Sequence, residues 1–302
     1  MATSLTDGMS VSVEVLEPLP QASAPADLAL RDLGPISPRP SRRVRPRWWF
    51  ELGFVVVLDL LYEMIRNEAP DQVAEAVGNS RSVLHVEHLV GLDIESGINA
   101  LFASHAWLAI PANYCYSTLH TVVAVAVLVW LYVARPTRYR RARSVLLAMT
   151  LIALVGYWLF PLAPPRLTTG AGFVDTVRAF STWGVSPATP VVSASNPYAA
   201  MPSMHVGWAL WSGTMLARFA HRPWLRVLGV CYPLATFLVV VATANHFVLD
   251  GLVAAVVFVG SLAVVHLVGR AATRTRRWVR PGVLLSGRPR AGGLAPVTKP
   301  AS

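Results

Sequence analysis

Two histidines, one aspartate and one arginine in this sequence have types and spacings that suit phosphoryl transfer. His246 and Asp250 stand four residues apart at the head of an apolar run, so on a helix they share one face. A carboxylate one turn away can orient a nucleophilic imidazole and stabilise the positive charge that develops on it. His205 offers a second imidazole for acid–base catalysis, and the Arg166 guanidinium can bind phosphate oxygens as a fork.

Each of these features also has a purely structural interpretation. A His-x-x-x-Asp pair on a helix is more often a satisfied structural pair, and Ser203 stands where a serine commonly caps a helix. Their joint occurrence favours a catalytic site, because Asp250 is one of very few acidic residues after Glu95. We therefore expect Ser203 and Asn245 to assist Arg166 in binding the phosphate, with the N–H groups of a helix start nearby.

The composition is that of a membrane protein. The chain has 302 residues, of which 54% are hydrophobic and 14% are charged, whereas soluble domains carry about 25% charged residues. Apolar runs longer than about 18 residues recur along it, which predicts several transmembrane helices. The net charge of +10 comes from arginines in short segments between those runs, without a nucleic-acid-binding motif. We therefore expect a membrane lipid substrate and no nucleic acid partner.

The predicted fold is all-α, with six transmembrane helices in a catalytic domain over residues 47–270. Residues 1–46 and 271–302 are predicted to be disordered tails. Two short amphipathic segments after the first span, 83–92 and 94–102, are expected to lie as helices in the membrane interface. The six spans are predicted over residues 48–65, 107–133, 144–160, 202–219, 227–243 and 245–268.

The basic segments predict the orientation in the membrane. They are the N-terminal tail, residues 134–143, residues 218–226 and the C-terminal tail, and the positive-inside rule places all four in the cytoplasm. We therefore expect a multi-pass protein of the plasma membrane with both termini in the cytoplasm. Arg166, His205 and His246 all fall at the outer ends of their spans.

Other polar residues near the outer face are candidates for substrate binding. Asn113, Tyr116 and His120 stand three and four residues apart on the second span. They either line a substrate pocket or form hydrogen bonds between helices. The 167–201 loop, with Asp175, either holds a polyol acceptor or is an ordinary connection.

The motifs resemble those of a known family. Pro202-Ser203-Met204-His205 and Asn245-His246-Phe247-Val248-Leu249-Asp250 resemble the second and third signatures of the type 2 phosphatidic acid phosphatase superfamily. The segment 160–166 is similar to one in its inositol phosphorylceramide synthase-like branch, and the resemblance covers roughly residues 50–268. It implies a helical membrane enzyme that acts on lipid phosphates without a metal or other cofactor. His246 would form a phosphohistidine, with Asp250 as its partner, His205 as acid and base, and Arg166 as phosphate ligand.

The sequence also departs from the phosphatase pattern. The first signature, a lysine followed by Arg-Pro, has no match before Pro202, Val240 stands where an arginine is expected, and Met204 replaces a glycine. These differences favour the synthase-like branch. We expect transfer of a phospho-alcohol group, at the extracytoplasmic face, between a phospholipid and an alcohol such as inositol or a lipid hydroxyl. A phosphatase of lipid phosphate or polyprenyl phosphate is the alternative.

A transporter is the alternative from another functional class. Asp59, Glu63, His120 and Asp250 would then form a proton relay within the membrane. The spans show no inverted repeat, and the polar residues gather at one face, which favours the enzyme. A zinc site built from the two histidines and Asp250 is chemically possible, but the expected reaction does not require it.

Overall fold

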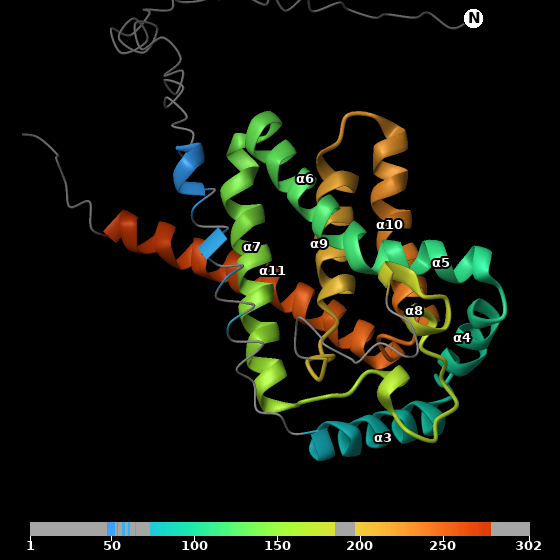
Figure 1. Ribbon diagram of the computed structural model, residues 1–302. Helices are drawn as coiled ribbons and strands as arrows, with labels where there is room; N and C mark the ends of the chain where they lie inside the picture. Colours follow the sequence, from blue (N-terminus) through green and yellow to red (C-terminus); the bar gives the residue numbers. More distant parts are fainter. Residues whose placement is uncertain are drawn as a thin grey trace, which may run out of the picture. The chain divides into compact units, whose positions relative to one another are not determined.

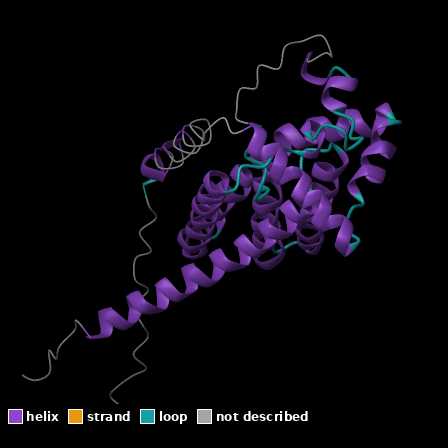
Figure 2. Ribbon diagram, turned by 90° about the horizontal axis from the view of Figure 1, so that it is seen from below, coloured by secondary structure: helices purple, strands orange, loops and turns teal. Residues whose placement is uncertain are grey.

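The computed structural model describes residues 73–184 and 197–278, together with 47–51, 53, 56, 57, 60 and 64. These residues belong to one unit, 45–302, and within them the chain forms helices and loops (Figures 1 and 2). The predicted N-terminal tail, Asp59 and Glu63 lie outside the described residues, as does the chain beyond 278. Among the described residues the one β contact is an isolated bridge between Leu162 and Ala199.

The helices follow one another with short connections, except for the long segment between α7 and α9. In chain order the elements are α3 (Val73–Val90), α4 (Glu95–Ala103), α5 (Ala106–Tyr114), a π-helical turn (Cys115–Leu119), α6 (His120–Ala134), α7 (Pro136–Leu159), a 3₁₀ turn (Pro165–Leu167), α8 (Thr176–Ala179), a second 3₁₀ turn (Thr182–Gly184), α9 (Met204–Phe219), α10 (Pro223–Ala242) and α11 (Val248–Trp278).

Four helices of the described chain are long and apolar enough to cross a membrane. They are the continuous helix Ala106–Ala134, α7, α10 and the Val248–Ala272 part of α11. The predicted span at 202–219 forms the 16-residue α9, which is shorter than the usual span of about 17–25 residues. The predicted span at 48–65 lies largely outside the described residues. The last helix continues to Trp278, past the predicted end of the membrane domain at residue 270.

Helix α9 is the central element of the bundle. It packs against α6, α7, α10 and α11, and the Trp211 side chain in its middle is completely buried. The Trp211 indole N–H donates to the carbonyl of Ala142 on α7, at 2.9 Å. Helices α9 and α10 approach closely because both have glycine at the contact: a Cβ on Gly213 would lie 2.2 Å from the carbonyl oxygen of Gly229. Small residues allow such backbone contacts in membrane proteins.

The outer faces of the long helices are apolar. Such faces suit contact with lipid chains, because the bilayer core replaces water around them. The exposed large side chains include Val122, Val125, Val129 and Val133 of α6, Leu151 and Val155 of α7, Leu228 and Leu234 of α10, and Leu252, Val256 and Val259 of α11. The chain is therefore a membrane protein.

Helix α3 lies below the other helices in Figure 1 and holds the proline-rich segment that follows α7. It begins at Val73, earlier than the predicted segment 83–92. The Asn79 amide donates to the Pro161 carbonyl at 2.8 Å, and the Ser80 hydroxyl donates to the Ala163 carbonyl at 2.6 Å. These bonds fix the path of the chain just before Arg166.

Candidate active site

His246 lies in the tight turn between α10 and α11, not on a helix as the spacing predicted. Helix α10 ends in a Schellman motif, in which Ala244 takes the left-handed conformation with φ of 52°. The Ala244 N–H bonds the Val241 carbonyl, and the Asn245 and His246 N–H groups both bond the Val240 carbonyl. This turn reverses the chain and places His246 just before the first turn of α11.

Asp250 contacts His246 across the start of α11. One carboxylate oxygen, Oδ2, lies 3.2 Å from His246 Nδ1 and accepts the backbone N–H of Phe247 at 3.0 Å. The carboxylate is completely buried, and His246 is 5% exposed. An ionised carboxylate in this position accepts the hydrogen of Nδ1, and the lone pair of the imidazole is then on Nε2.

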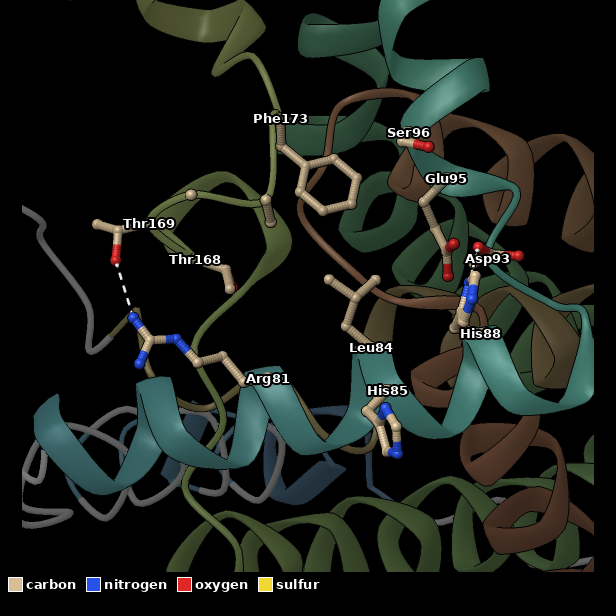
Figure 3. Close-up of a pocket in the computed structure, with 12 residues that line it drawn as sticks. Arg81, Leu84, His85, His88, Asp93, Glu95, Ser96, Thr168, Thr169 and Phe173 are labelled. Atoms are coloured by element: carbon tan, nitrogen blue, oxygen red, sulfur yellow. Dashed lines mark hydrogen bonds and ion pairs between the residues drawn. The ribbon is translucent and has the colours of Figure 1, made fainter.

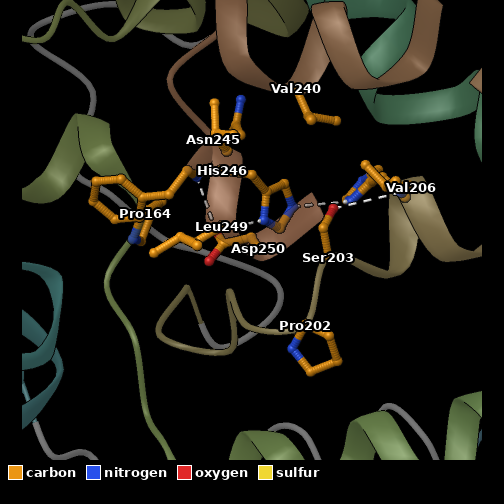
Figure 4. Close-up of polar contacts among 12 residues, drawn as sticks. Pro164, Pro202, Ser203, Val206, Val240, Asn245, His246, Leu249 and Asp250 are labelled. Atoms are coloured by element: carbon orange, nitrogen blue, oxygen red, sulfur yellow. Dashed lines mark hydrogen bonds and ion pairs between the residues drawn. The ribbon is translucent and has the colours of Figure 1, made fainter. Parts of the chain in front are cut away.

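His205 faces the other nitrogen of the His246 ring. Ser203 caps α9 by accepting the Val206 N–H, and the Ser203 N–H donates to the Asp250 carbonyl at 3.1 Å. The starts of α9 and α11 are thereby joined, and His205 Nδ1 lies 3.3 Å from His246 Nε2. Figure 4 shows His246 between Asp250 and the start of α9.

Arg166 reaches the same turn from the segment after α7. The backbone N–H of Arg166 donates to the Ala244 carbonyl at 2.9 Å, and the guanidinium Nε–H donates to the side-chain oxygen of Asn245 at 2.8 Å. Asn245 is held in turn by bonds from its amide to the backbone and hydroxyl oxygens of Thr243. One terminal nitrogen of Arg166 lies 3.7 Å from Asp175, which also caps α8. The predicted phosphate ligands Arg166 and Asn245 therefore contact each other beside His246.

The three candidate pocket residues of the second span separate into two groups. Tyr116 stacks on His205 with ring centroids 4.3 Å apart, and the His120 ring is 4.0 Å from the same histidine. Asn113 instead bonds Thr176 and Thr182 of the loop after α7. The π-helical turn that begins at Cys115 explains the separation, since its wider turn changes the face on which the following residues lie. Asn113 therefore forms hydrogen bonds to a neighbouring segment, which was the alternative to lining a substrate pocket.

Two buried glutamates near the site were not identified as site residues from the sequence. Glu87 and Glu95 are both completely buried, although they belong to the segments 83–92 and 94–102, which we expect to lie in the membrane interface. The signal was the spacing on α3, where Glu87 follows Ala76, Ser80 and Val83 on the buried face. A charged residue in the apolar stripe of an amphipathic helix indicates a specific partner.

A cavity of about 490 Å³ lies between α3 and the loop that follows Arg166 (Figure 3). Glu95 lines it, whereas none of the predicted site residues does. At its edge the His88 imidazole bonds Asp93 at 2.7 Å and holds the pKa of that carboxyl below its usual range. The polar lining comprises Arg81, His85, His88, Asp93, Glu95, Ser96, Thr168 and Thr169.

Comparison with known proteins gives the family. Residues 81–264 match the family model described as the PAP2 superfamily. The chain has no significant match among curated proteins or solved structures. The matched region holds all the residues of the site described above, including both histidines, Asp250 and Arg166. It covers well over half of the chain, which is therefore a phosphatase- or phosphotransferase-like membrane protein and belongs to the PAP2 superfamily.

Proposed function

We propose that this protein is a metal-independent lipid phosphotransferase that works through a phosphohistidine on His246. The observation that carries the proposal is the alignment of three groups. His246 stands between Asp250 Oδ2, 3.2 Å from its Nδ1, and His205 Nδ1, 3.3 Å from its Nε2. An imidazole with a carboxylate on one nitrogen and an acid–base group beside the other fits the nucleophile, orienter and proton donor of a two-step transfer.

The hydrogen-bond order supports the roles of the two histidines. With the hydrogen of His246 on Nδ1, its Nε2 lone pair accepts the Nδ1–H of His205. In the first step Nε2 attacks phosphorus, a P–N bond forms, and the bond from phosphorus to the lipid oxygen breaks. His205, which enters this step as an imidazolium, gives its Nδ1 proton to that oxygen and becomes neutral. In the second step His205 removes the proton of the acceptor hydroxyl, whose oxygen attacks phosphorus as the P–N bond breaks.

Arg166 supplies the positive charge for the phosphoryl group. Its guanidinium is bound on the Nε edge by Asn245 and keeps further donors for phosphate oxygens. Positioned charge of this kind is the main protein contribution to phosphoryl transfer. Asn245 acts by orienting Arg166. Ser203, whose hydroxyl caps α9, contributes the helix start as a further anion-binding element.

The limited exposure of His246 favours transfer over hydrolysis. With only 5% of its surface exposed, the ring is shielded from bulk water, so a bound alcohol competes well for the phosphohistidine. We propose that the donor is a phospholipid and the acceptor a polyol such as inositol or a lipid hydroxyl, as in the inositol phosphorylceramide synthase-like branch. Release of free phosphate would instead identify a lipid or polyprenyl phosphate phosphatase.

The arginines support an extracytoplasmic site, and we propose the plasma membrane as its location. The α9 and α10 helices carry arginines at one end, Arg218 and Arg222, and the site at the other. The positive-inside rule puts the arginine ends, and with them both chain termini, in the cytoplasm. A proton-coupled transporter fits less well, because His205, His246 and Asp250 lie together at these helix ends and not at midplane.

Product analysis by mass spectrometry tests the proposal. The purified protein is incubated with lipid phosphates and phospholipids, with and without myo-inositol, in the presence of a metal chelator. We expect a transferred phospho-alcohol product that is lost in His246→Ala and strongly reduced in His205→Ala. His266→Ala, an exposed histidine at the far end of α11, is the matched control and should retain activity. Undiminished turnover in His246→Ala would refute the nucleophile, and complete inhibition by the chelator would refute metal independence.

A further inference from the structure

The first N–H groups of α11 are bound by carboxylates from three different helices. Asp250 accepts from Phe247, Glu95 Oε1 of α4 accepts from Val248 at 2.8 Å, and Glu87 Oε1 of α3 accepts from Leu249 at 2.7 Å. These groups have no intrahelical partner at a helix start, and they attract negative charge. The start of α11 is therefore fixed from outside by α3 and α4.

Three buried carboxylates at one helix start cannot all be charged. Each is completely buried, and in the described part of the chain no cation pairs with Glu87 or Glu95. A helix N-terminus compensates only about half of one elementary charge. Glu87 Oε2, Glu95 Oε2 and Asp250 Oδ1 are all buried without a protein hydrogen-bond partner. Protonation of one glutamate provides the missing donor, since a neutral carboxyl group can donate to a neighbouring carboxylate.

The titration of Glu87 agrees with this arrangement. Burial, and after it the hydrogen bond with Glu95, raise the pKa of Glu87 to about 9, against the lowering by the Leu249 N–H. The charged groups that face it are Glu95 from α4 and Asp250 from α11. On α3 itself, His88 is exposed and binds Asp93. At neutral pH Glu87 is therefore the protonated member of the pair.

We propose that Glu87 and Glu95 are positioning residues, a carboxyl–carboxylate pair that holds one proton and sets the start of α11 so that Asp250 meets His246. The pair touches neither reacting nitrogen and acts only through the backbone of Val248 and Leu249. Its effect on catalysis rests on the proposed function, but its effect on the fold does not.

The pair makes the free energy of unfolding decrease as the pH rises into the alkaline range. The pKa of Glu87 in the folded protein, about 9, lies above the ordinary value of 4.5. The folded state therefore holds the proton more tightly than the unfolded state does. The resulting stability is fully present below pH 4.5 and is lost as the pH rises towards 9, so the melting temperature should fall across the neutral to alkaline range.

Melting curves and kinetics of the full-length protein in detergent between pH 6 and pH 10 test the proposal. In Glu87→Gln, the amide can donate to Glu95 and accept from Leu249 without titrating. We expect this variant to melt at a higher temperature than the wild type at pH 7, because it does not have to take up a proton on folding, to lose the alkaline decrease, and to keep kcat within about threefold. Glu87→Ala should melt lower and lose kcat at least tenfold. Glu75→Gln, exposed on the same helix, should match the wild type.

The two proposals fail in different ways. If the wild type turns over no lipid phosphate but Glu87→Gln still flattens the melting curve, the shared proton stands and the proposed function fails. If Glu87→Gln and the wild type have the same pH dependence of melting, the shared proton is refuted. Glu87→Ala with wild-type stability and kcat would refute the positioning role.

Discussion

Asp250→Asn separates the charge of the carboxylate from its hydrogen bonds. Oδ2 alone faces both the His246 ring and the Phe247 N–H, whereas Oδ1 has no protein partner. An asparagine with its carbonyl oxygen in the Oδ2 position keeps both contacts and places its amide where Oδ1 stood. The substitution therefore removes the negative charge while retaining the geometry of the turn.

The size of the effect follows from the distance between the groups. Attack by His246 creates a positive imidazole 3.2 Å from Oδ2. With an effective dielectric constant of about 20, two unit charges at that separation attract by about 5 kcal/mol. Each 1.36 kcal/mol of lost transition-state stabilisation lowers the rate tenfold, so kcat should fall by about three to four powers of ten.

Rapid-quench measurement of phosphohistidine formation is the suitable assay, because it isolates the first step from acceptor binding. The melting temperature of Asp250→Asn must also be measured. We expect it to change by only a few degrees, since the side chain still accepts the Phe247 N–H at the start of α11. Asp250→Ala removes the cap as well and should be both inactive and less stable. A stable Asp250→Asn protein that forms phosphohistidine at more than a tenth of the wild-type rate would refute the electrostatic role of Asp250.

Three further predictions follow from the site and its supports. Arg166→Lys should raise KM for the phosphorylated donor at least tenfold in steady-state kinetics, because lysine lacks the planar fork of the guanidinium; an unchanged KM would contradict the role of Arg166. Gly213→Ala should lower the melting temperature by several degrees, since its Cβ would meet the Gly229 carbonyl at 2.2 Å; Gly260→Ala, with open space around the new Cβ, is the control. Ala244→Gly should stabilise the fold by about 1 kcal/mol, because glycine removes the left-handed strain; a lower free energy of unfolding would contradict this.

The sequence predicted the helical membrane fold better than the details of the site. Long apolar runs are strong signals, and four of them form helices of the required length. The 16-residue α9 satisfies the same pattern although it is short, because hydropathy does not distinguish a buried helix from a lipid-facing one. The spacing of His246 and Asp250 suggested one helix face, yet a turn brings them together. Alanine rarely adopts the left-handed conformation that makes this turn, so Ala244 gave no signal.

Glu87 and Glu95 show why part of the site could not be predicted. Their partners, the N–H groups of Leu249 and Val248, are more than a hundred and fifty residues away along the chain. Almost every residue has a backbone N–H, so a contact with one leaves no characteristic residue in the sequence. A pattern of buried spacing on α3 indicates that Glu87 faces the interior, but only the tertiary structure shows what it meets there.

The contact between Arg166 and Asn245 has a consequence for how such proteins are recognised. Val240, where the family signature expects an arginine, is 1% exposed in an apolar cluster, and its carbonyl is occupied by the turn that carries His246. The guanidinium beside the turn comes from 79 residues earlier. A signature written as consecutive letters would reject this chain for lacking a cation that it holds in space. Searches for distant enzymes of this kind should therefore compare which charges surround the histidine in three dimensions, whatever segment delivers them.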